Sequence, residues 1–400
     1  MKKSTRFQYI FTGTLMMLFL GAIYAWSYFK TALSAEFPIW NQKQLSLTFT
    51  IMMILFAGGG VLGGKLSKTI KHSVLALVSG ALMLIGFVAV SFLPVVRENM
   101  ALIMLYIFYG GFTGLGVGIG YNIVLACVNS WFPDKDGLIS GILLTGFGFS
   151  SLIIANIADT LLQVTSLFVI FRGLGILCGA IMLLGSVFLR LPGQNDVLPA
   201  PRQKAVVSGG QDYTTGQMLR RPTFWLYFLW NLCMSATGML VINNAASIAL
   251  FFGAAATVGL LVSIFNSGGR LFIGASMDKF GWKATMFIDN AVIIAAGLLM
   301  VLGNSLGLFP LVLIGMLLAG VCYGGGVTIQ ASLVRSFYGS KNYAVNFSTC
   351  NLVMIPAAFI GPMISAALVD AAGGAFGPTF VMVVVMGLGS LLINFFIRKP

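Results

Sequence analysis

Long apolar stretches alternate with short polar ones along the whole of this 400-residue chain. A helix needs about 20 mainly apolar residues to cross the hydrocarbon core of a bilayer. The pattern predicts twelve such spans, at residues 8–30, 44–64, 73–93, 101–127, 138–158, 166–189, 223–248, 255–276, 285–303, 309–333, 343–368 and 376–397. We therefore expect an all-α integral membrane protein, and we keep the first stretch as a span because it is longer than a signal-peptide core.

Composition and charge support a membrane location, since 58% of the residues are hydrophobic and only 8% are charged. With the N-terminus inside, the inner loops hold every lysine and arginine except Lys30, Lys43, Arg97, Arg172 and Arg270. Short cytoplasmic loops are enriched in positive charge, so both termini are predicted to be cytoplasmic. This bias explains the net charge of +13. We therefore expect a multi-pass protein of the cell (plasma) membrane whose partner is the lipid bilayer, with no nucleic acid.

Two short loops repeat along the chain and indicate an internal duplication. The loop G-G-K-L-S-K at residues 63–68 matches G-A-S-M-D-K at residues 274–279, and W-F-P-D-K-D-G at residues 131–137 loosely matches F-Y-G-S-K-N-Y at residues 337–343. The two offsets are nearly equal, which favours six spans plus six. We predict an N-terminal six-helix bundle at 1–190, a cytoplasmic linker without regular structure at 191–221, and a C-terminal six-helix bundle at 222–400.

Glycines gather in the fourth predicted span and again at Gly324, Gly325 and Gly326 in the tenth. A dinucleotide-binding fingerprint would need a strand before the glycines and a helix after them, and neither is predicted here. Small residues within membrane spans let neighbouring helices approach closely. We therefore interpret both groups as packing or bending sites rather than phosphate loops.

Arg270 is the most informative residue, because it lies within a predicted span that is otherwise free of charge. An arginine at such depth costs about 2.5–3.5 kcal/mol on insertion scales and marks a functional site by default. Its planar guanidinium can hold a carboxylate through two parallel hydrogen bonds. The alternative is a structural charge paired with Asp278 in the loop or Asp289 near the inner end of its span. We favour binding of a small organic anion.

Catalytic chemistry has little support in the sequence. The five cysteines are scattered through the spans without a C-x-x-C pair, and the single histidine, His72, flanks a basic loop. A zinc site, a catalytic triad and other cofactor chemistry are therefore not expected, and we do not predict an enzyme.

Three motifs carry a resemblance to a known family. They are W-F-P-D-K-D-G-L-I-S-G at 131–141, T-G-Q-M-L-R-R-P-T-F-W at 215–225, and N-S-G-G-R-L-F-I-G-A-S-M-D-K-F-G at 266–281. With them the chain resembles the major facilitator superfamily, and within it the oxalate/formate antiporter family, which is related to monocarboxylate transporters. The resemblance implies the major facilitator fold, in which two six-helix bundles expose a site to alternate sides of the membrane.

The resemblance also implies a substrate site. Arg270 falls on the family's carboxylate-binding arginine, and Tyr24, Tyr121 and Tyr323 fall on aromatic wall positions. Without the resemblance, each tyrosine could equally belong to the interfacial belt or to helix packing. Gly274, Asp278 and Lys279 belong to the superfamily's conformational loop, although plain solvated charges are an alternative. The family's lysine of the eleventh span is matched here by Cys350 beside Asn351.

We therefore expect a transporter of a small monocarboxylate such as lactate, pyruvate or formate, because one arginine leaves the second charge of oxalate uncompensated. Exchange or facilitated transport ranks first, since Asp159, Asp289 and Asp370 fall toward span ends. Proton-coupled symport, oxalate:formate exchange and transport of a hydrophobic solute are alternatives, and outside transporters a membrane anion sensor. We expect a monomer.

Overall fold

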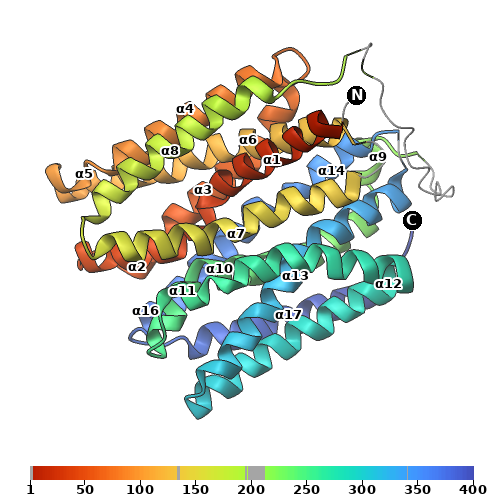
Figure 1. The fold of residues 1–400 in the computed structure, drawn as a ribbon. Helices are drawn as coiled ribbons and strands as arrows, with labels where there is room; N and C mark the ends of the chain where they lie inside the picture. The colour runs from red at the N-terminus through yellow and green to blue at the C-terminus, as the bar shows by residue number, and fades with distance from the viewer. Residues whose placement is uncertain (1–2, 133–135, 194–195, 197–211, 340) are drawn as a thin grey trace. The chain divides into compact units, whose positions relative to one another are not determined.

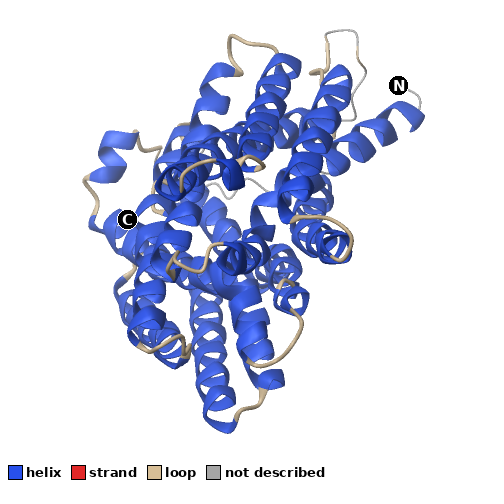
Figure 2. Ribbon diagram, turned by 90° about the vertical axis from the view of Figure 1, so that its left-hand side faces the viewer, coloured by secondary structure: helices blue, strands red, loops and turns tan. Residues whose placement is uncertain are grey.

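The computed structural model describes residues 3–132, 136–193, 196, 212–339 and 341–400, apart from the side chains of a few of them. All regular secondary structure among these residues is helical, as Figure 2 shows in blue. The prediction of an all-α protein is therefore confirmed.

Twelve helical stretches in the described part of the chain are long and apolar enough to cross a membrane. They are Arg6–Glu36, Gln42–Leu66, His72–Val90, Asn99–Ser130, Leu138–Leu162, Leu167–Phe188, Pro222–Phe251, Ala256–Met277, Lys279–Leu306, Phe309–Tyr338, Val345–Ala371 and Gly377–Phe396. Their number and order are as predicted, while several ends differ. The ninth span, for example, begins at Lys279 rather than 285.

Contacts divide the chain into two compact units, Met1–Ala32 with Leu47–Lys204, and Leu33–Ser46 with Ala205–Pro400. The first unit contains α1 (Lys3–Leu20), η1 (Gly21–Ala25), α4 (His72–Val90), η2 (Leu93–Val95), α5 (Glu98–Met104), η3 (Leu105–Thr113), α6 (Gly114–Ser130), α7 (Asp136–Leu162) and α8 (Leu167–Phe188). α2 (Trp26–Glu36) and α3 (Gln42–Leu66) run across the unit boundary. Within this unit α4 packs against α6 and α8, and α1 packs against α7. Figure 1 traces these helices from red to yellow-green.

The second unit contains the helices coloured green to blue in Figure 1. They are α9 (Thr215–Leu219), α10 (Pro222–Phe251), α11 (Ala256–Gly259), α12 (Leu261–Leu306), α13 (Phe309–Tyr338), α14 (Tyr343–Asn351), α15 (Met354–Ala358), η4 (Phe359–Met363), α16 (Ile364–Ala371) and α17 (Gly377–Phe396). Within this unit α12 packs against α13 and α17, and α10 packs against α13, α15 and α17.

The predicted linker, 191–221, contains one short helix. Residues 194–195 and 197–211 lie outside the described part of the chain. α9 begins at a capping box in which the side chains of Thr214 and Gln217 each accept a hydrogen bond from the other's backbone N–H. This cap satisfies backbone donors at the start of the helix. The expectation of no regular structure is therefore wrong at Thr215–Leu219, while the boundaries at 190 and 222 stay a prediction.

Close glycine contacts explain how the helices approach one another. A Cβ at Gly118 of α6 would lie 2.2 Å from the Phe56 carbonyl oxygen of α3, and a Cβ at Gly114 would lie 2.6 Å from the Met52 carbonyl oxygen. Any larger residue at either position would force the two helices apart. The interpretation of these glycines as packing sites is confirmed.

Gly281 divides α12 into two helical limbs, which form the eighth and ninth spans. Its φ of 76° and ψ of 172° lie in a region that residues with a Cβ rarely adopt. The non-helical backbone at this residue makes a kink between the limbs without a separate loop. The helix of the ninth span therefore starts earlier than the hydrophobic pattern suggests.

Candidate functional site

Arg270 lies on the first limb of α12, within the span Ala256–Met277. Its Nε and Nη1 atoms are buried, and neither has a hydrogen-bond partner among the described residues. Both carboxylate oxygens of Asp289 are also buried, and neither has a hydrogen-bond partner in the described part of the chain, so Arg270 and Asp289 do not pair with each other. Burial of these two nitrogens without an acceptor costs free energy, which a bound anion would offset. This geometry supports an anion-binding role.

Small residues bring α13 close to the arginine. A Cβ at Gly269 would lie 2.1 Å from the Val321 carbonyl oxygen, so the backbones of α12 and α13 are in direct contact beside Arg270. The Thr328 hydroxyl of α13 donates a 3.4 Å hydrogen bond to the Arg270 carbonyl oxygen. Arg270 is thus positioned by the packing of two helices.

Tyr323 lies on the same helix, α13, and is 9% exposed. Its ring packs over Gly238 of α10, where an added Cβ would lie 2.3 Å from the tyrosine Cγ. The structure therefore places Arg270 and Tyr323 on two helices of one unit that pack together, with Tyr323 against a third. Helix packing thus accounts for the position of Arg270, and the contact with Gly238 accounts for the position of Tyr323.

Tyr24 and Tyr121 lie in the first unit, on η1 and α6, and share an aromatic neighbour. Both rings pack edge-on against Phe147 of α7, with centroid distances of 5.2 Å for Tyr24 and 5.1 Å for Tyr121. Phe56 of α3 packs edge-on against Tyr121 at 5.5 Å. Edge-on aromatic pairs fix ring orientation. Phe56 and Phe147 were missed in the sequence, where phenylalanine in an apolar span is too common to be a signal.

The position matched to the family lysine is electrically neutral. Cys350 is 1% exposed, and Asn351 accepts a 2.7 Å hydrogen bond from the Gln330 side chain of α13. Gln330 in turn accepts a 3.0 Å hydrogen bond from Asn231 of α10, whose side-chain oxygen accepts one from Ser235. These amides link three spans without any charge. Sequence reasoning missed Asn231 and Gln330, although uncharged polar residues inside apolar spans were a visible signal.

The eleventh span is interrupted directly after Asn351. α14 ends there and α15 begins at Met354. Pro356 explains the break, because it has no N–H to offer the carbonyl group of Leu352 one turn earlier and its ring crowds that group. Interrupted spans are common at the binding sites of transporters. The break therefore adds to the reasons for placing a polar site here.

The predicted conformational loop is described only in part. Gly274 is half-buried beside α13, where an added Cβ would meet Thr328 Cγ2 at an ordinary 3.6 Å. Lys279 is exposed, with Nζ 5.1 Å from the centre of the Phe280 ring. The side chain of Asp278 lies outside the described residues. The role of this loop stays a prediction.

Asp289 is more deeply placed than expected. It is wholly buried within the ninth span, on the second limb of α12, and its backbone carbonyl oxygen accepts a 3.6 Å contact from the Cys322 thiol of α13. The ninth span begins at Lys279, before the kink at Gly281, and has 28 residues, of which Asp289 is the eleventh. The expectation of an acid toward the span end is corrected here.

These features define a multi-pass helical membrane protein with an arginine inside one of its spans, two of whose buried nitrogens have no partner among the described residues. The chain belongs to the Major Facilitator Superfamily, whose family model matches residues 5–357. It is accordingly a secondary transporter of a small solute and not an enzyme.

Three relatives are similar over most of the chain. The uncharacterized MFS-type transporter YhjX of Escherichia coli (strain K12) is 31% identical over 85% of this chain and 83% of its own. The oxalate:formate antiporter of Oxalobacter formigenes is 28% identical over 84% and 79%, respectively. The apicoplast pyruvate carrier 1 of Toxoplasma gondii is 26% identical over 74% and 65%.

The fold is also that of a solved transporter structure. A crystal structure of a D-xylose-proton symporter superimposes with a TM-score of 0.72 over 98% of both chains. The two sequences are 16% identical, so this likeness shows the fold alone.

Proposed function

We propose that this protein carries a small monocarboxylate, of the lactate, pyruvate or formate class, across the cell membrane by alternating access. The observation that carries the proposal is the Arg270 guanidinium, with two buried nitrogens that lack an acceptor among the described residues. A carboxylate would supply that acceptor through charge-assisted hydrogen bonds. Tyr24, Tyr121 and Tyr323 would contact the remainder of the substrate.

A monocarboxylate is favoured over a dianion because the matched position of the eleventh span is neutral. Cys350 and Asn351 bring no positive charge to the site, and Asn351 is held by an amide. A second carboxylate would therefore be desolvated without a cation, which is costly. One relative is named for the monocarboxylate pyruvate, which supports the same choice, whereas the other is named for both oxalate and formate and does not separate the two classes.

The transport cycle follows from the same charge. We propose that the bundles 1–190 and 222–400, joined by the linker 191–221, rock about the bound anion in a monomer. The substrate neutralises Arg270, so closure around the loaded site costs less than closure around the bare guanidinium. This difference favours exchange or facilitated transport over movement of the empty carrier.

Uptake of radiolabelled lactate, formate and oxalate into proteoliposomes tests the proposal, with vesicles either empty or preloaded with substrate. We expect uptake of a monocarboxylate that preloading accelerates. Arg270→Gln should reduce it by at least about thirtyfold, since truncation of one partner of a buried charge pair costs about 2–5 kcal/mol. Arg172→Gln is the matched control, because it makes the same substitution at an arginine of the first unit whose Nε already has a partner, the Ser91 hydroxyl at 3.3 Å. Uptake by this variant should equal that of the parent. If the Arg270→Gln variant is folded and takes up substrate as well as the parent does, the proposal is wrong.

A further inference from the structure

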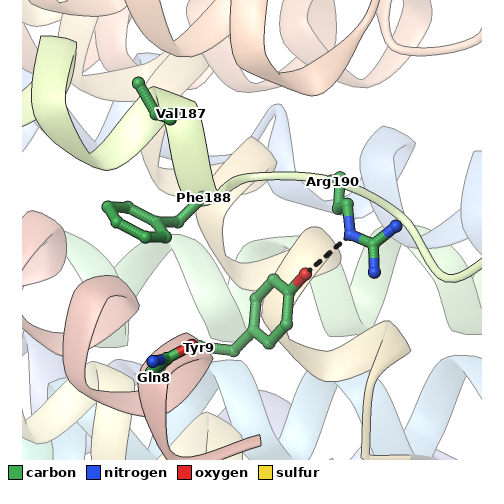
Figure 3. A pocket seen from close by; sticks show the side chains of 5 residues that line it. All are labelled: Gln8, Tyr9, Val187, Phe188 and Arg190. Carbon is green, nitrogen blue, oxygen red and sulfur yellow. Dashed lines mark hydrogen bonds between the residues drawn. The ribbon is translucent and has the colours of Figure 1, made fainter. Parts of the chain in front are cut away.

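A small open pocket lies in the first unit, at the end where the first span begins and the sixth span ends. It has a volume of about 120 Å³ and is lined by Gln8, Tyr9, Val187, Phe188 and Arg190. Figure 3 shows the Tyr9 hydroxyl turned toward the Arg190 guanidinium across this pocket. None of these residues belongs to the proposed transport site.

The walls of the pocket are held in place by close packing. A Cβ at Gly185 of α8 would lie 2.4 Å from Met16 Sδ of α1, so the two helices are in tight contact one turn below the pocket. Tyr9 is 7% exposed and stacks on Trp131 with a centroid distance of 4.5 Å. The phenol that faces the pocket is therefore rigid.

Arg190 is anchored through both its backbone and its side chain. Its carbonyl oxygen accepts a 2.7 Å hydrogen bond from Trp131 Nε1, and its Nε donates to the Tyr9 hydroxyl at 3.2 Å. The hydrogen bond to Tyr9, together with the Asp196 carboxylate, raises the pKa of the guanidinium, which therefore stays protonated. The side chain is still 62% exposed. A fixed guanidinium with its outer nitrogens accessible is suited to a phosphate group.

The pocket has one polar and one apolar side. Gln8 and Arg190 form the polar side, whereas Val187 and Phe188 are 77% and 50% exposed at the end of a membrane-spanning helix. The positive-inside rule predicts that this end faces the cytoplasm, where the leaflet carries anionic lipids. A phosphate placed at Arg190 would thus have apolar side chains directly beside it on the membrane side.

We propose that this pocket binds an anionic phospholipid, with Arg190 holding the headgroup phosphate, Gln8 donating a second hydrogen bond, and Val187 and Phe188 contacting the acyl chains. Asp196 has an oxygen 3.7 Å from Arg190 Nη2, which is an ion pair at the edge of contact distance. The lipid phosphate would displace this carboxylate. Asp196 is therefore an internal competitor for the site.

The competitor provides a test in which two substitutions act in opposite directions. Lipid binding to the purified full-length protein in detergent would be measured by native mass spectrometry, with phosphatidylglycerol, phosphatidylcholine and inorganic phosphate as probes. We expect phosphatidylglycerol to bind in preference to phosphatidylcholine. Arg190→Gln should weaken that binding about tenfold through loss of a charge-assisted contact, and Asp196→Asn should strengthen it.

Lys68→Gln is the matched control, because it removes one exposed positive charge from the same predicted side of the membrane without touching the pocket. Binding should be unchanged in this variant. Equal weakening by Lys68→Gln and Arg190→Gln would overturn the proposal in favour of general charge attraction. If inorganic phosphate displaced phosphatidylglycerol at equal concentration, the pocket would be a phosphate site and the proposal of a lipid ligand would be wrong. If Arg190→Gln does not fold, unchanged binding in Asp196→Asn overturns the proposal by itself.

Discussion

Replacement of Gly324 by alanine should separate the two helices that position Arg270. Gly324 lies on α13 against α12, and an added Cβ would lie 1.7 Å from the Asn266 carbonyl oxygen and 2.8 Å from its side-chain oxygen. The carbonyl belongs to helical backbone and cannot rotate away as a flexible side chain could. The helices themselves must therefore move.

The size of the effect follows from that distance. An ordinary nonbonded contact is about 3.5 Å, so α13 would have to shift from α12 by roughly 1.5–2 Å at this point. Insertion of a methyl group into a packed interior costs about 1–3 kcal/mol, and a clash with backbone lies at the upper end. For a unit of this size, a loss of about 3 kcal/mol corresponds to a fall in Tm of about 6–12 °C.

Gly326→Ala is the matched control on the same helix. An added Cβ there would lie 3.8 Å from Asn231 Oδ1, which is an ordinary contact. Alanine is also favoured over glycine within a helix by about 0.5–1 kcal/mol. Thermal unfolding of the detergent-purified protein should therefore show a large fall in Tm for Gly324→Ala and none for Gly326→Ala. Equal Tm values for both variants and the parent would refute the close approach of α12 and α13.

Three further substitutions probe the backbone, a hydrogen bond and a buried charge, each read out as the same thermal unfolding. Gly281→Ala should cost about 1–3 kcal/mol through its φ of 76° alone, since nothing lies within 4 Å of an added Cβ, and a neutral result would contradict the kink. Tyr28→Phe removes a 2.9 Å hydrogen bond to Asp159 and should cost about 1–2 kcal/mol, while an unchanged Tm would argue against that bond. Asp289→Asn should keep or raise the Tm, because it removes a buried carboxylate without a described partner, and a large fall would reveal a partner for the charge.

Hydropathy alone was sufficient to predict the membrane spans, because a bilayer imposes both the length and the apolar character of each helix. The same constraint made Arg270 stand out, since a charge in such a span needs an explanation. Glycine clusters were also informative, and Gly118 and Gly324 do lie where helix backbones meet.

Pairings between distant residues could not be predicted in this way. Asn231 and Gln330 are 99 positions apart in sequence and meet only because α10 packs against α13. The depth of Asp289 was misjudged for a local reason. A positive φ at Gly281 replaces the loop that the polar residues around it suggested, and hydropathy does not register backbone conformation.

The interruption in the eleventh span also bears on how the helix moves. Within an α-helix each N–H donates to the carbonyl group four residues earlier, whereas the N–H groups of Leu352 and Val353, between α14 and α15, donate to Thr349 and Cys350, three residues earlier, a pattern with poorer hydrogen-bond geometry. The segment around Leu352 and Val353 should therefore exchange its amide hydrogens sooner than the helical turns on either side of it. Asn351 lies at this joint, so a ligand bound beside it would contact the span at the point where its backbone hydrogen-bond pattern changes.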